Sequence, residues 1–277
     1  MAFNMDRNSI QTVRRLQLGT SRLEKLEKEV LDVFLDKSWL HLGDANVPEN
    51  SQEKRSWAYF CRKLKRRSII EHVVHNLSKP FRRKKKAIES KSDIDDLYSQ
   101  TNFVEYYYTK GDRLPLEDGS VEFVYSEHFF EHLFLDEALA LMRECNRVLK
   151  SNGVIRTCVP DEINNFCLGT STGEVIDEGL PYTDPRKHKI MWTVYSLCEA
   201  LAICGFQAVP LHFSKKDGVR VQHEPSSMSG KYSECCDKEM VNNLDYVRRK
   251  PMSLLVDGIK VSSPASYETW DNQALLP

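Results

Sequence analysis

The chain has 277 residues, a length that suits one α/β domain with an insertion. Its composition is that of a globular protein, and a formal net charge of -1 excludes polyanion binding driven by overall charge alone. No run approaches the roughly 18 apolar residues that span a bilayer, and residues 1–15 lack the apolar centre of a secretory signal. The eight cysteines include no CxxC pair, which favours a reducing compartment. We therefore expect a soluble, cytoplasmic protein.

Strand and helix patterns alternate through the first part of the chain. Residues 14–19 (RRLQLG) form a short alternating pattern that ends in glycine, and residues 21–37 carry apolar side chains at helical spacing. Residues 38–44 and 68–77 are typical of two further strands. This strand–helix–strand order predicts a parallel sheet.

The second half has the same alternation. We expect Ser151–Gly153 to close a helix as a left-handed C-cap. We predict a single domain over residues 1–277, built on a doubly wound, mostly parallel seven-stranded sheet whose last hairpin is antiparallel. The remaining elements are expected as strands over 102–112, 121–127, 154–161, 206–213 and 252–261, and as helices over 135–150 and 193–206.

Two insertions interrupt this pattern. Residues 50–100 form a basic, partly mobile insertion, because Lys54–Lys91 carries fourteen Lys or Arg against two acidic residues. A solvated surface segment, a nucleic-acid contact and an anionic partner all fit this charge. The run of five basic residues at positions 82–86 could also serve as a nuclear import signal. Residues 214–251 form a polar insertion before the last strand. In the basic insertion, the residues expected to contact nucleic acid or another anionic partner are Arg82, Arg83, Lys84, Lys85 and Lys86.

Four residues are predicted at the carboxyl ends of strands, where doubly wound sheets bind ligands. They are Gly19, Asp44, Asp112 and Ser126. A glycine lets the backbone approach a ligand, a carboxylate after the second strand can accept both ribose hydroxyls, and a further acid can meet an adenine amino group. The pattern favours a cofactor with a nucleoside, although Thr109 competes with Asp112 for the third position.

Residues 110–161 (KGDRLPLEDGSVEFVYSEHFFEHLFLDEALALMRECNRVLKSNGVIRTCVPD) resemble the S-adenosylmethionine-dependent methyltransferases of the Rossmann-like class, in particular the type 11 branch. Residues 188–206 and 253–260 resemble later blocks of that branch. The resemblance implies S-adenosylmethionine as cofactor and methyl transfer to an acceptor that the sequence does not identify. It also implies that Gly19, Thr20 and Ser21 form the first cofactor-binding loop.

The same resemblance places Ser126, Glu127 and His128 at the tip of the fourth strand, facing the methyl donor. A sulfonium carries its own leaving group, so positioning and a base near neutral pKa suffice for transfer. His128 is the best candidate base, with Glu127 or Glu131 to orient it. The alternative is that His128 and His132 are structural. Asp161 and His188 are further candidates on loops over the pocket.

His128, Glu131 and His132 also spell HxxEH, which is a zinc-hydrolase signature when it lies on one helix. We expect His128 to lie in a loop directly after a buried strand, and no further motif marks a third ligand. The resembling methyltransferases contain similar letters without using them for a metal. We therefore expect no metal site.

Two other functions remain open. The first loop reads LQLGTS, so Ser21 stands where the family has a second glycine, and its Cβ crowds the backbone's approach to a cofactor. This departure favours a catalytically inactive, methyltransferase-like binding or scaffold protein. The basic insertion favours a nucleic-acid-binding protein in which the methyltransferase core is incidental.

Overall fold

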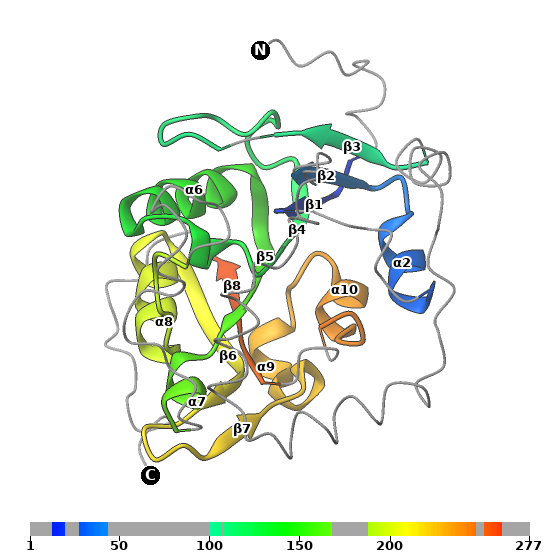
Figure 1. Ribbon diagram of the computed structural model, residues 1–277. Coiled ribbons are helices and arrows are strands. Elements are labelled where there is room, and N and C mark those ends of the chain that lie inside the picture. Colours follow the sequence, from blue (N-terminus) through cyan, green and yellow to red (C-terminus); the bar gives the residue numbers. More distant parts are fainter. Residues whose placement is uncertain are drawn as a thin grey trace, which may run out of the picture.

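The structure is a computed structural model that describes residues 13–19, 28–43, 100–106, 108–167, 188–247 and 252–261. Within these residues, eight strands form one sheet in the order β3-β2-β1-β4-β5-β8-β6-β7 (Figure 1). The strands are β1 (Arg15–Leu18), β2 (Trp39–Gly43), β3 (Asn102–Glu105), β4 (Val121–Glu127), β5 (Leu149–Pro160), β6 (Phe206–Ser214), β7 (Arg220–Gln222) and β8 (Ser253–Lys260).

The pairing of the strands confirms the predicted fold class. Strands β3, β2, β1, β4 and β5 are parallel to their neighbours, and β8 enters antiparallel between β5 and β6. The expected antiparallel final hairpin is therefore confirmed. The sheet has one strand more than the seven expected, because β7 pairs with β6 inside the polar insertion. The strand predicted over 68–77 lies outside the described residues.

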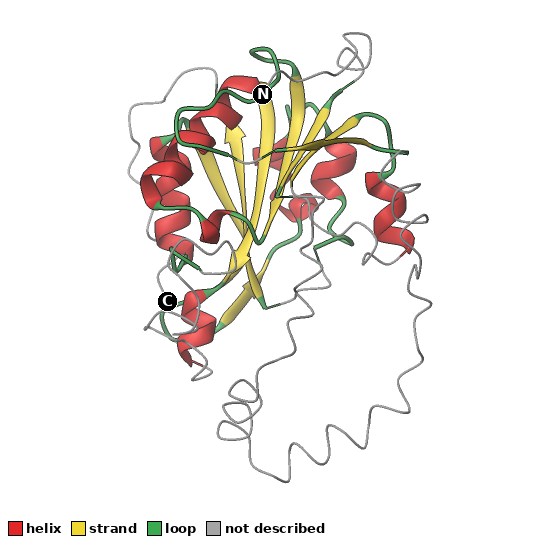
Figure 2. Cartoon of the chain, turned by 45° about the horizontal axis from the view of Figure 1, so that its top comes forward, coloured by secondary structure: helices red, strands yellow, loops and turns green. Residues whose placement is uncertain are grey.

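Helices cover both faces of the sheet (Figure 2). Buried side chains of α6 and α8 pack with Leu16 and Leu18 on one face. On the other face, side chains of α2 and α10 pack with Phe123 and Tyr125. The helices are α2 (Lys28–Phe34), α6 (Leu135–Val148), α7 (Glu162–Cys167), α8 (Val194–Ile203), α9 (Ser229–Tyr232) and α10 (Lys238–Asn242), with 3-10 turns η4 (Phe130–His132) and η5 (Pro225–Met228).

The expected left-handed cap after α6 is wrong. The helix ends at Val148, and the next residue, Leu149, has an extended backbone with φ -71° and ψ 140° and begins β5. Leu149 pairs with Val121 of β4 and is fully buried, so strand pairing replaces the cap. The left-handed residue is Asn152, with φ 61°. By contrast, Gly205, which follows α8, does have a positive φ of 86°.

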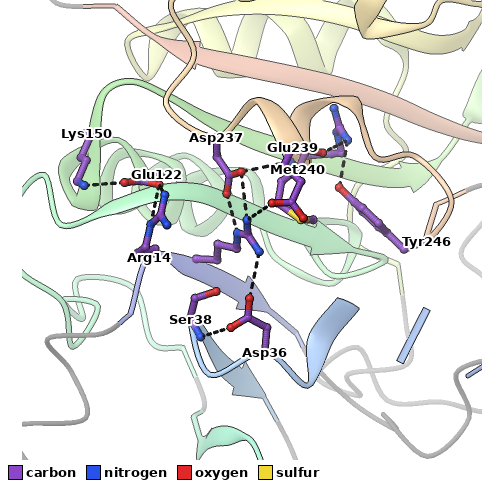
Figure 3. A network of polar contacts seen from close by, with 11 residues as sticks. Arg14, Asp36, Ser38, Glu122, Lys150, Asp237, Glu239, Met240 and Tyr246 are labelled. Atoms are coloured by element: carbon purple, nitrogen blue, oxygen red, sulfur yellow. Dashed lines mark hydrogen bonds and ion pairs between the residues drawn. The ribbon is translucent and has the colours of Figure 1, made fainter. Parts of the chain in front are cut away.

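The polar segment 214–251 contributes to the core. The guanidinium group of Arg156 on β5 donates hydrogen bonds to the carbonyl oxygens of Met240, Val241 and Asn243 and to the hydroxyl of Tyr246. Met240 lies in α10 and Tyr246 follows that helix (Figure 3), and both side chains are almost completely buried. A buried guanidinium needs many acceptors, and this segment supplies them.

A second buried arginine ties β1 to the same segment. Arg15 donates from Nε to Asp237 at 2.6 Å, and Asp237 also accepts a hydrogen bond from the backbone N–H of Met240 at the start of α10. Asp36 and Glu239 lie within 3.5 Å of the same guanidinium (Figure 3). The ion pairs therefore hold α10, β1 and the turn after α2 together.

No helix among the described residues is long and apolar enough to cross a membrane.

Candidate functional site at the carboxyl edge of the sheet

The sheet reverses its strand order between β1 and β4. Four of the predicted site residues lie at or directly after the ends of these two strands: Gly19, Ser126, Glu127 and His128. Leu18 at the end of β1 is in register with Ser126 of β4, which is in register with Thr157 of β5. Gly19 follows β1 with φ 71°, and its N–H donates to Leu42 of β2 at 2.9 Å. The carboxyl ends of β1, β2 and β4 therefore lie side by side, as a doubly wound ligand site requires.

Gly19 is in close contact with the loop after β4. A Cβ atom added to Gly19 would lie 2.6 Å from Cδ2 of Phe129, and its φ is in the left-handed region. Both features require glycine here. The ring of Phe129 thus lies against the turn after β1, where the resemblance predicts the first cofactor loop.

Two buried hydroxyl groups lie beside this turn. Ser126 and Thr157 are both 0% exposed, and neither hydroxyl oxygen has a hydrogen-bond partner among the described residues. Buried polar groups are almost always paired. Ser126 is the penultimate residue of β4, so its unpaired hydroxyl suits a polar ligand at the end of this strand. The hydroxyl of Ser126 and the backbone of Gly19 are compatible with holding the adenosyl part of a cofactor.

His128 lies in a loop rather than in a helix, as predicted. Its backbone has φ 51°, a strained value for a residue other than glycine. Its Nε2 lies 3.1 Å from Oγ of Ser253, and its Nδ1 lies 3.1 Å from Oε1 of Glu131. The backbone N–H of His128 donates to Cys158 at 2.8 Å. Both ring nitrogens are therefore engaged, and the imidazole is held in one orientation.

The structure also brings His188 to the HxxEH segment. The ring centroids of His132 and His188 are 5.0 Å apart, and ligand atoms of these two residues and Glu131 lie within 4.8 Å of one another. Burial lowers the pKa of His188, while the nearby Glu131 carboxylate opposes that shift. No sequence motif marks His188 as a third ligand, because it lies 56 positions beyond His132.

Other predicted site residues lie elsewhere. Asp112 is exposed, seven positions beyond the end of β3 rather than at its end, and its carboxylate accepts from the N–H of Thr109 in a turn. Asp161 is buried, and its carboxylate accepts a hydrogen bond from the Arg220 guanidinium at 2.7 Å and another from the backbone N–H of Ser214 at 2.8 Å. These contacts give Asp161 a structural role. Thr20, Ser21, Asp44 and the basic run Arg82–Lys86 lie outside the described residues.

Sequence reasoning missed two residues of the site. Ser253 begins β8, and β8 runs antiparallel to β5, so its first residue lies at the edge where the parallel strands end. Phe129 has no motif that marks it. The only signal for Ser253 was the expectation of an antiparallel last strand.

The strand order and the switch point between β1 and β4 define a Rossmann-like α/β protein. Residues 57–157 match the type 11 family model described as "Methyltransferase domain", which is less than half of the chain. This match confirms the predicted resemblance to the methyltransferases. A comparison with curated proteins gave no match.

Solved structures with similar arrangements include two archaeal proteins. A methyltransferase dependent on S-adenosylmethionine from Archaeoglobus fulgidus is 16% identical, with a TM-score of 0.44, and the match covers 91% of this chain and 89% of that one. One from Methanosarcina mazei is 14% identical, with a TM-score of 0.43, covering 94% and 98%. Because these TM-scores are below 0.5, the fold assignment depends on the strand order.

Proposed function

We propose that this protein is an S-adenosylmethionine-dependent methyltransferase whose acceptor binds at the carboxyl edge of the sheet. The observation that carries the proposal is the convergence of Gly19, Ser126 and His128 at the switch point between β1 and β4. The match of residues 57–157 to a methyltransferase domain supports it.

The residues of the chain have separate roles in this proposal. The backbone of Gly19 and the hydroxyl of Ser126 hold the cofactor, with Thr20, Ser21, Asp44 and Asp112 as further candidate cofactor-binding residues. When bound, the cofactor supplies an activated methyl group on a sulfonium.

His128 is the proposed base, and the Glu131 carboxylate, 3.1 Å from Nδ1, orients the ring so that Nε2 faces Ser253. Ser253 Oγ, 3.1 Å from Nε2, would relay the proton of the acceptor: it gives its own proton to Nε2 and takes one from the acceptor hydroxyl or amine as the methyl group is transferred. Glu127, half-buried at the end of β4, stays a proposed catalytic residue.

Calorimetric titration with S-adenosylhomocysteine tests cofactor binding without knowledge of the acceptor. We expect saturable binding to the full chain, and absence of heat would reject the proposal. Once an acceptor is known, the His128→Ala variant should keep that binding and lose turnover. Undiminished turnover would exclude His128 as the base.

A matched pair of serine variants locates the binding site. Ser126 and Ser214 are both fully buried and both have hydroxyl groups without a partner among the described residues, but Ser214 ends β6, away from the switch point. We expect Ser126→Ala to weaken binding of S-adenosylhomocysteine about tenfold, equivalent to one lost hydrogen bond of about 1.4 kcal/mol. Ser214→Ala should leave it unchanged.

A second candidate function is a methyltransferase-like binding or scaffold protein without cofactor. The contact between Phe129 and Gly19 favours it, since that ring occupies space beside the first loop. In this case the wild-type chain gives no heat with S-adenosylhomocysteine. Binding that appears only in the Phe129→Ala variant would identify the ring as the block. The basic insertion, which motivated a nucleic-acid-binding alternative, lies outside the described residues.

A further inference from the structure

We propose that Glu131, His132 and His188 form a binding site for a divalent transition-metal ion of the zinc class. The inference does not depend on methyl transfer. One carboxylate and two imidazoles are a common ligand set for zinc when three protein side chains leave a position open. This proposal departs from the expectation of no metal site, which was based on His128 and His132 as the only imidazole pair considered and on the absence of a motif for a third ligand.

The burial of Glu131 is the first independent observation. Its side chain is 1% exposed, and neither carboxylate oxygen accepts a well-aligned hydrogen bond from a described residue. Removing an ionised carboxylate from water without such bonds costs several kcal/mol, so buried charges are paired or coordinate metals. His128 Nδ1 approaches Oε1 at 3.1 Å, and this contact leaves Oε2 free for an ion.

The backbone fixes the other two ligands close to this carboxylate. Glu131 and His132 are successive residues of the short helix η4, and the N–H of His132 donates to Phe129 at 3.0 Å. The N–H groups of Lys189 and Ile190 both donate to the carbonyl oxygen of Glu131, at 2.6 and 3.2 Å. His188 therefore reaches the cluster from a segment that is hydrogen-bonded directly to η4.

The cluster is close to the dimensions that a metal requires. Ligand atoms about 2.0–2.2 Å from a tetrahedral zinc ion lie about 3.4 Å from one another, and those of the three side chains lie within 4.8 Å. Rotations of the half-buried His132 and His188 rings can close this difference of up to about 1.4 Å. Contact with His128 on the other carboxylate oxygen would then orient Glu131, as outer hydrogen bonds commonly do for metal ligands.

Titration with zinc alone tests the site in the full chain without cofactor. Protein treated with a chelator and then dialysed is titrated by calorimetry and by competition with a chromophoric chelator. The chain has further histidines and cysteines, so the informative quantity is the difference between wild type and variants. We expect His188→Ala and Glu131→Gln each to abolish the binding of one equivalent of zinc, or to lower the affinity for that equivalent at least tenfold.

His223→Ala is the matched control, because His223 is a half-buried histidine that follows β7 outside the cluster. It should bind zinc as the wild type does. Zinc should also raise the thermal midpoint of the wild type and of His223→Ala, but not that of His188→Ala. Circular dichroism checks that each variant is folded. If Glu131→Gln does not fold, the more accessible His188→Ala decides the result.

Two results would overturn the site: no zinc bound by the wild type, or equal zinc binding by wild type, His188→Ala and Glu131→Gln. Either can occur with normal binding of S-adenosylhomocysteine, and absence of that binding can accompany normal zinc binding. The failure of the metal site and the failure of the proposed function are therefore distinguishable.

Discussion

Arg156 and Asp257 form a two-point ion pair between β5 and β8, with Nε–Oδ1 and Nη2–Oδ2 distances of 2.8 and 2.7 Å and both side chains 0% exposed. Asp257 also accepts from the hydroxyl of Tyr232 at 2.9 Å. Burial beside this carboxylate raises the pKa of Tyr232 well above its ordinary value. The pair joins the sheet to the segment before β8.

Replacing Arg156 with Met should lower the free energy of unfolding by about 3–5 kcal/mol, because Asp257 is then buried without its partner. The double variant Arg156→Met with Asp257→Leu should recover part of that loss. Urea unfolding measures both. Lys110→Met is the control, since Lys110 and Asp136 form an exposed ion pair, and its cost should be below about 1 kcal/mol. Equal losses in the free energy of unfolding for Arg156→Met and Lys110→Met would contradict the importance of the buried pair.

Gly19→Ala should destabilise the protein by about 2 kcal/mol, from a left-handed backbone and from the contact with Phe129. Phe129→Ala removes the contact but not the backbone strain. In a double-mutant cycle, the Gly19→Ala substitution should therefore cost less when Phe129 is already alanine. Chemical denaturation of the four proteins gives the coupling, and strictly additive costs would show that the contact is unimportant.

The stability of the protein should decrease as the pH falls from about 6.5 to about 4. His41 is fully buried between the Gln17 side chain and the carbonyl oxygen of Phe34, and desolvation lowers its pKa to about 4. Between that value and the unfolded pKa of about 6.5, the unfolded chain binds the additional proton. The contribution of neutral His41 to the free energy of unfolding is complete above pH 6.5, and about 3 kcal/mol of it is lost by pH 4.

Urea unfolding at several pH values checks this slope. Carboxylates add to it, so the comparison is with His41→Gln, which should show a shallower dependence. His223→Ala should keep the wild-type slope. An unchanged slope in His41→Gln would exclude His41 as the source.

Alkylation should distinguish the adjacent cysteines. Cys236 is exposed, whereas Cys235 is buried and its pKa is raised by burial to about 11. At neutral pH, iodoacetamide should modify Cys236 first among the cysteines that the structure describes, because the thiolate is the reactive form. Peptide mass spectrometry gives the order, with fully denatured protein as the reference. Labelling of Cys235 at the same rate would contradict the burial.

The sequence alone determined the sheet and its class, because the period-two and period-3.6 patterns of apolar residues record which faces are buried. The buried strand predicted over 121–127 corresponds to β4, and the helical spacing of apolar residues over 135–150 predicted α6 closely. The glycine after residue 18 marked the end of β1. Local patterns of this kind depend on near neighbours, so they can be read in order along the chain.

Only the tertiary structure decided which distant residues meet. The approach of His188 to Glu131, of Ser253 to His128 and of Phe129 to Gly19 depends on strand order and on hydrogen bonds between loops. The helix cap expected at Ser151–Gly153 was overridden for the same reason, because pairing of Leu149 with Val121 begins a strand there. Long-range pairing leaves no periodic signal in the sequence, so the site could be predicted only in part.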